Sequence, residues 1–146
     1  MSQMSNYLEN KLVDWLLRGQ SLPTISNLYI GLHTADPTDA GTGAEVSTSG
    51  TGYARQAIAA SLNNFCGTQG TGTTTASSGT SGASSNNVAV NFSAATSGWG
   101  TVTHVGIWDA STGGNLLFYG SLTVSKTVTT GDPFVFSINA LTITLA

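Results

Sequence analysis

Charged residues are scarce in this sequence, because only 8% of its residues are Asp, Glu, Lys or Arg, against about 25% in typical globular proteins. Between Gln56 and Trp108 no residue carries a formal charge at neutral pH when His104 is counted as neutral. A free monomer usually relies on surface charge for solubility. A surface of Thr, Ser, Asn and Gly therefore favours a chain that packs against neighbouring subunits. The alternative is a loop-rich secreted protein with a neutral polar surface.

Basic residues are scarcer still, and the net charge is −3. The four cations are scattered along the chain, so no basic patch for nucleic acid is expected; they are Lys11, Arg18, Arg55 and Lys126. Cys66 is the single cysteine, which excludes an internal disulfide. One Cys and two distant His residues do not predict a metal site.

Long apolar runs are missing as well. No stretch approaches the ~20 apolar residues of a membrane-spanning helix, so no membrane partner is expected. The segment from Met1 to Gly19 is not typical of a secretory signal peptide, because Glu9, Lys11, Asp14 and Arg18 interrupt it. The sequence therefore predicts synthesis in the cytoplasm of the producing cell.

One amphipathic helix is predicted over residues 5–18. Leu8, Leu12, Trp15 and Leu16 follow the i, i+4, i+7, i+8 spacing of a single helical face. Asn6 is the expected N-cap, with Glu9 three residues on, and Gly19 suits the left-handed position after the last turn. The apolar face either covers a β-core as a lid or docks as an arm on a neighbouring subunit.

The rest of the chain has the two-residue alternation of β-strands. About eight strands with turns every eight to twelve residues favour a β-sandwich of the jelly-roll type, and no βαβ alternation occurs. One domain over 1–146 is expected, with the sandwich over 28–146 and a Gly/Ser/Thr-rich loop over 67–87. The predicted strands cover residues 28–33, 53–62, 88–92, 99–109, 115–122, 124–128, 134–138 and 141–145.

No catalytic arrangement emerges from the sequence, which therefore predicts a protein that is not an enzyme. His33 and His104 lie in predicted strands and outside any nucleophile motif. Asp36, Asp39 and Glu45 share a loop, but they lack the spacing of a calcium-binding EF-hand loop. Asp36 before Pro37 is more typical of an Asx turn than of a calcium ligand.

Aromatic residues allow two interpretations. They form either a core with subunit contacts or, less in keeping with the pattern, an exposed platform for sugars. The residues concerned are Trp99, Trp108, Tyr119, Phe134 and Phe136.

Several segments together resemble a widespread family of small tailed-phage proteins, usually labelled tail-fibre or virion structural proteins, some of them similar to jelly-roll cement proteins of capsids. The family brings no catalytic residues. The tract over 67–87 is longer than expected for it, and Phe136–Ala140 lacks the expected Gly-Asp pair. The segments that carry the resemblance are Leu28–Pro37, Ala40–Val46, Gly52–Gln56, Trp99–Asp109, Gly113–Leu117, Lys126–Val128 and Gly131–Asp132.

The resemblance and the low charge lead to one main expectation and one alternative. The main expectation is a capsid cement or decoration protein on the phage head, without cofactors, with the major capsid protein and copies of itself as partners, the self-association giving a trimer. The alternative is a tail-fibre or baseplate component with a role in receptor or glycan binding. The expected assembly contacts are Leu8, Leu12, Trp15, Leu16, Trp99 and Trp108.

Overall fold

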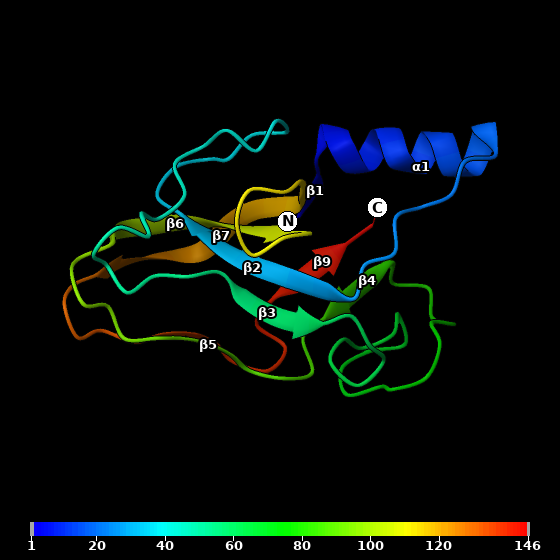
Figure 1. Ribbon diagram of the computed structural model, residues 1–146. Coiled ribbons are helices and arrows are strands. Elements are labelled where there is room, and N and C mark those ends of the chain that lie inside the picture. Colours follow the sequence, from blue (N-terminus) through cyan, green and yellow to red (C-terminus); the bar gives the residue numbers. More distant parts are fainter. Residues whose placement is uncertain (1, 146) are drawn as a thin grey trace.

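The computed structural model describes residues 2–145, and its 35% strand and 9% helix place it in the mainly β class (Figure 1). Met1 and Ala146, the ends of the predicted domain, lie outside the described residues. The elements in chain order are β1 (Gln3–Met4), α1 (Asn6–Arg18), β2 (Asn27–His33), β3 (Gln56–Ala59), β4 (Ala83–Ser85), β5 (Val90–Phe92), β6 (Gly100–Trp108), β7 (Leu116–Val128), β8 (Phe134–Phe136) and β9 (Thr142–Thr144).

The strands form a sandwich with unequal layers. One layer is a five-stranded antiparallel sheet in the order β1-β7-β6-β2-β3. The other consists of two antiparallel ribbons, β4 with β9 and β5 with β8. The expected β-sandwich is therefore confirmed, although its second layer is divided rather than one continuous sheet.

The main core lies between these layers. Ile30 and Leu32 on β2 are fully buried and pair across the ladder with Ile107 and Val105 on β6. Burial of an aliphatic side chain of this size contributes roughly 1.5–3 kcal/mol. Against them packs a group of aromatic rings, mostly in edge-to-face pairs, the preferred geometry for aromatic contacts. These rings belong to Tyr53, Phe92, Trp99, Phe134 and Phe136.

The opposite face of the five-stranded sheet carries a smaller cluster of Trp108, Leu116 and Tyr119. Because successive residues of a strand point to opposite faces, the odd-numbered residues of β2 lie on this side, including His33. The segment over 34–46 runs across it, and Gly41 approaches Trp108 and Leu116 so closely that a β-carbon there would lie 3.1–3.2 Å from their side chains. Glu45 and Arg55 lie on this face, because a β-carbon on Gly31 would lie 3.1 Å from Glu45 Oε1 and the Arg55 guanidinium lies over the Trp108 ring.

Helix α1 projects from the sandwich and is attached at its first turn (Figure 1). The predicted cap was wrong by one residue, since the Ser5 side chain accepts a hydrogen bond from Leu8 N while the Ser5 backbone donates to Leu117 O. Gly19 adopts the predicted left-handed conformation with φ of 70°. None of the helix residues is buried and the main contact is with β7, so α1 has the position of an arm rather than of a lid.

Two strand predictions need correction. The strands expected at 115–122 and 124–128 form one strand, β7, interrupted by a bulge between the pairs Ser121–His104 and Lys126–Val102, where the four residues 122–125 lie opposite the single residue Thr103 of β6. The tract over 67–87, expected to be loop throughout, contains β4. The small residues of β4 pair with β9. The sequence did not predict this strand, because a strand of Ala and Ser lacks the alternation of apolar and polar residues.

The two ends of the described chain lie side by side. The Ser2 hydroxyl accepts a hydrogen bond from Thr144 N at 2.8 Å and lies 3.3 Å from Thr144 O. Strand β1 next to it pairs with Phe118 and Tyr119 on β7.

Candidate functional site

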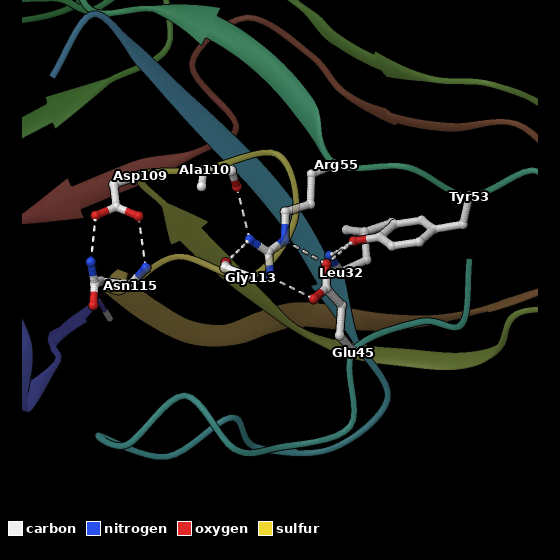
Figure 2. Close-up of polar contacts among 8 residues, drawn as sticks. All are labelled: Leu32, Glu45, Tyr53, Arg55, Asp109, Ala110, Gly113 and Asn115. Carbon is white, nitrogen blue, oxygen red and sulfur yellow. Dashed lines mark hydrogen bonds and ion pairs between the residues drawn. The ribbon is translucent and has the colours of Figure 1, made fainter. Parts of the chain in front are cut away.

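Arg55 is the centre of a polar network, because its guanidinium donates four hydrogen bonds (Figure 2). Its Nε and Nη2 donate to the two carboxylate oxygens of Glu45 at 2.8 and 2.7 Å, the bidentate geometry that suits a guanidinium. Its Nη1 donates to the backbone oxygens of Ala110 and Gly113, each at 2.8 Å. One side chain therefore joins the loop before Tyr53 to the β6–β7 hairpin.

Tyr53 completes this network on the core side. Its hydroxyl donates to Glu45 Oε1 at 2.9 Å and accepts from Leu32 N at 2.8 Å. Burial alone would raise the pKa of the Glu45 carboxyl, but the hydrogen bonds and the charge of Arg55 outweigh it and bring that pKa below its usual value. Burial, followed by the charge of Glu45, raises the pKa of Tyr53. Glu45 is thus an ion-paired carboxylate at neutral pH.

The Trp108 ring packs beneath the Arg55 guanidinium. The guanidinium lies 3.8 Å from the centre of that ring, a close cation–π contact. The ring fits because Gly31 and Gly106 pair across the ladder beneath it. A β-carbon on either glycine would lie within 3.1 Å of Trp108 Nε1.

His33 is a buried titratable group beside the Trp108 ring. Its ring stacks on Trp108 at 5.9 Å between centroids, and neither ring nitrogen has a hydrogen-bond partner among the described residues. Burial lowers the pKa of His33, although the charge of Glu45 opposes that effect. His104, its ladder partner, contacts the Thr103 hydroxyl through Nδ1 at 2.8 Å. The two histidines are neighbours, but no nucleophile is arranged between them.

The hairpin that Arg55 grips is closed by its own side chains (Figure 2). The Asp109 carboxylate accepts from the backbone N–H and from the side-chain amide of Asn115, both at 2.7 Å. The backbone of Asp109 donates to Asn115 O at 3.1 Å. These bonds hold the hairpin in a conformation in which its backbone oxygens accept hydrogen bonds from the Arg55 guanidinium.

The three acids of the first loop have separate partners. Asp36 accepts from Thr38 N at 2.8 Å, which is the expected Asx turn, and Asp39 accepts from the Tyr119 hydroxyl. Burial first and this hydrogen bond second raise the pKa of Tyr119 to about 12. Within residues 2–145, no group of three or more His, Cys, Asp or Glu side chains is placed to hold a metal ion. The structure uses these acids to fasten the loop.

The aromatic residues do not form an exposed platform. Trp99 and Trp108 are only 5% and 6% exposed, so they leave little surface for a neighbouring subunit or a sugar. The other three residues of the proposed platform are equally buried, namely Tyr119, Phe134 and Phe136. The core interpretation is the one that the structure supports.

The helix residues expected to make assembly contacts divide into two groups. Leu8 and Leu12 are half-buried, whereas Trp15 and Leu16 are exposed. The sequence analysis missed Val13 and Leu17, which are also exposed on α1. The sequence shows that both residues are apolar. They were missed because the predicted apolar face was centred on the side of the helix that carries Leu8 and Leu12, which turns toward the sandwich. Contact with another chain stays a prediction for these residues.

A groove of about 480 Å³ opens between β7 on one side and β8 and β9 on the other. Apolar side chains from both layers line it, including Ile107, Phe118, Phe134 and Ile143. β1 pairs with β7 only at Phe118 and Tyr119, so within residues 2–145 the bulged half of β7 has no paired strand on the edge that faces away from β6. The sandwich is thus open along this side.

The described helix is neither long nor apolar enough to cross a membrane. A search of curated proteins finds no match. A family model does match, over residues 3–144, and its description places these proteins among the structural components of phage virions. The chain belongs to this family, described as Podophage GP4 fiber I protein gp80.

Proposed function

We propose that this protein is a structural subunit of a fibre on a tailed-phage virion. The observation that carries the proposal is the family match, which covers residues 3–144 and whose description names a fibre protein. The fibre alternative from the sequence thereby gains support that the capsid-cement expectation lacks. The proposed role is mechanical, in that the subunit links neighbouring virion proteins without catalysing a reaction.

The geometry of the Arg55 network supports a mechanical role. Both Glu45 oxygens are engaged by Arg55, and one of them by Tyr53 as well, so this carboxylate is not free to act as a base. The network instead fixes the first loop to the β6–β7 hairpin. A rigid outer face suits a subunit that transmits load.

The projecting helix and the open groove support a role in assembly. Soluble monomers rarely expose large contiguous apolar patches, and such patches mark interaction sites. Here α1 exposes four large apolar side chains, Val13, Trp15, Leu16 and Leu17. Together with the low charge of the whole chain, these surfaces favour a protein that functions in contact with others.

Copy number and position on the virion test the proposal. Peptides of this chain would be quantified by mass spectrometry relative to the major capsid protein in purified virions, and an antibody would locate the chain by electron microscopy. A fibre subunit gives tens of copies and label on the tail or its neck. A capsid cement gives hundreds of copies and label over the whole head, and that result would overturn the fibre proposal.

A further inference from the structure

The outward face of α1 combines apolar residues with a single acid. Glu9, Val13, Leu16 and Leu17 follow the i, i+4, i+7, i+8 spacing that aligns residues on one side of a helix. Val13, Leu16 and Leu17 are 48%, 72% and 75% exposed. An isolated helix of 13 residues is marginally stable in water, so this face gains from a partner.

Glu9 is the carboxylate that lacks a partner within the described chain. The other six acids each accept at least one hydrogen bond: Asp14 from Arg18, Asp36 from Thr38, Asp39 from Tyr119, Glu45 from Arg55, Asp109 from Asn115 and Asp132 from Thr129. Glu9 is exposed in the first turn of α1, where the helix dipole stabilises an acid, and its carboxylate is available to a cation on a surface that this face meets.

The groove supplies that cation. Lys126 is the single charged residue among those that line it. Its ammonium group donates to the Pro133 carbonyl and helps to lower the pKa of the nearby Asp132 carboxyl, but it forms no ion pair with a described carboxylate. Arg18 and Arg55 are already paired with Asp14 and Glu45, so Lys126 is the basic residue outside α1 that remains for Glu9.

The helix does not occupy the groove of its own chain. No residue of α1 is among those that line the groove, where the N-terminal segment is represented by Ser2. The first turn of α1 is tied elsewhere, through Ser5 to Leu117 and through Asn6 N to Asp39 O. Figure 1 shows the rest of the helix extending away from the strands.

We propose that the Glu9–Val13–Leu16–Leu17 face of α1 docks in the groove of a second copy, where Glu9 pairs with Lys126. The apolar side chains cover the open side of the sandwich, and the ion pair fixes the register, because an acid buried without a partner is strongly unfavourable. Helix and groove are different surfaces, so the contact is head-to-tail and repeats until it closes as a ring or continues as a filament.

Charge reversal tests this contact on the purified full chain, by sedimentation across a concentration series. We expect the wild type to self-associate and Glu9→Lys and Lys126→Glu each to weaken association about tenfold. The double variant, which restores opposite charges in exchanged positions, returns the association constant to within about threefold of the wild type. Circular dichroism and melting temperature confirm that the single variants remain folded.

A cross-linking experiment maps the same contact directly. A Leu17→Cys chain is mixed with a differently tagged Val135→Cys chain, since Val135 lines the groove, and the mixture is oxidised mildly. Disulfide-linked heterodimers are expected, whereas Ser111→Cys in the exposed hairpin, the control for Val135→Cys, yields few. A monomeric wild type, a double variant without rescue, or a weakening by Glu9→Lys alone, as α1–α1 pairing would give, overturns the proposal.

Discussion

Two long glycine-containing segments of this protein, the first loop over 34–52 and the tract over 67–87, are held in different ways. The first loop contains three acids, and each is bonded to a partner, with Glu45 joined to the buried Arg55 fork. The tract contains no charged residue and is held by hydroxyl and amide groups, such as Thr68 with Gly79 and Gln69 with Ala76.

The two segments differ in how many interactions share their stabilisation. A bidentate ion pair is strong, but it makes the attachment of the first loop depend on one pair of side chains. Neutral hydrogen bonds contribute about 0.5–1.5 kcal/mol each, and many of those in the tract lie near water. The first loop is therefore sensitive to a single substitution, whereas the tract loses order gradually.

Removal of Arg55 is expected to have the largest effect. Arg55→Ala leaves the half-buried Glu45 without its cation and frees two backbone oxygens, so the free energy of unfolding falls by about 3–5 kcal/mol. The Arg55 side chain is only 6% exposed. Denaturant unfolding measures the change. Arg18→Ala, which breaks the exposed Arg18–Asp14 pair on α1, is the control and changes stability by about 0.5 kcal/mol or less.

Asn86 is the expected weak point where the tract joins the core. Its buried side chain donates to Val88 O and Ser137 O and accepts from Leu141 N, each at 2.8 Å. Asn86→Ala leaves buried backbone groups unpaired and lowers stability by about 2–3 kcal/mol. Asn91→Ala, at an exposed position on β5, is the matched control. Equal melting temperatures for the two variants would contradict this prediction.

Acid sensitivity is expected to come first from His33. Because burial lowers the pKa of His33 below its ordinary value of 6.5, the unfolded chain binds a proton more readily, and stability decreases as the pH falls below about 6.5. His33→Gln should flatten this part of the profile of melting temperature against pH. His104→Gln, at the paired and less buried position, should leave the decrease in place.

Glu45 acts in a more acidic range. Its pKa is lowered, so its contribution is complete above about 4.5 and is lost as the pH falls through its lower value in the folded state. The His33→Gln variant should therefore keep this second decrease, which separates the two groups in one titration.

The smallest effect is expected within the tract. Thr68→Val removes the hydroxyl that accepts from Gly79 N at 3.0 Å, and stability falls by about 0.5–1 kcal/mol. Faster hydrogen exchange at Gly79, rather than a shift in global unfolding, is the sensitive measurement. A loss as large as that of Arg55→Ala would abolish the contrast between the two segments.

The sequence predicted the parts of the fold that depend on local periodicity. Alternation identified the core residues Ile30 and Leu32, and the helical spacing identified α1. The Arg55 site was not predicted, because Arg55 must meet Glu45 and the hairpin at Ala110 through tertiary folding. The sequence carried one signal of this ion pair. Charged residues are scarce, and Glu45 and Arg55 are successive charged residues of opposite sign along the chain.

The groove could not be predicted for a different reason. Its existence depends on the division of the second layer into two ribbons and on the bulge in β7. Val124, in this bulge, is 78% exposed and lines the groove. A pattern of alternating apolar residues predicts which residues face inward, but it does not specify whether another strand covers them.

The hydrogen bonds between Ser2 and Thr144 bear on how the chain is made. During translation Ser2 precedes its partner Thr144 by 142 residues, so this closure forms only after Thr144 has left the ribosome. Pairing of residues so distant in sequence is slow, because a large loop must close first. Because α1 precedes β2–β9 in the chain, its exposed apolar face is available for contacts before the strands of the sandwich are complete.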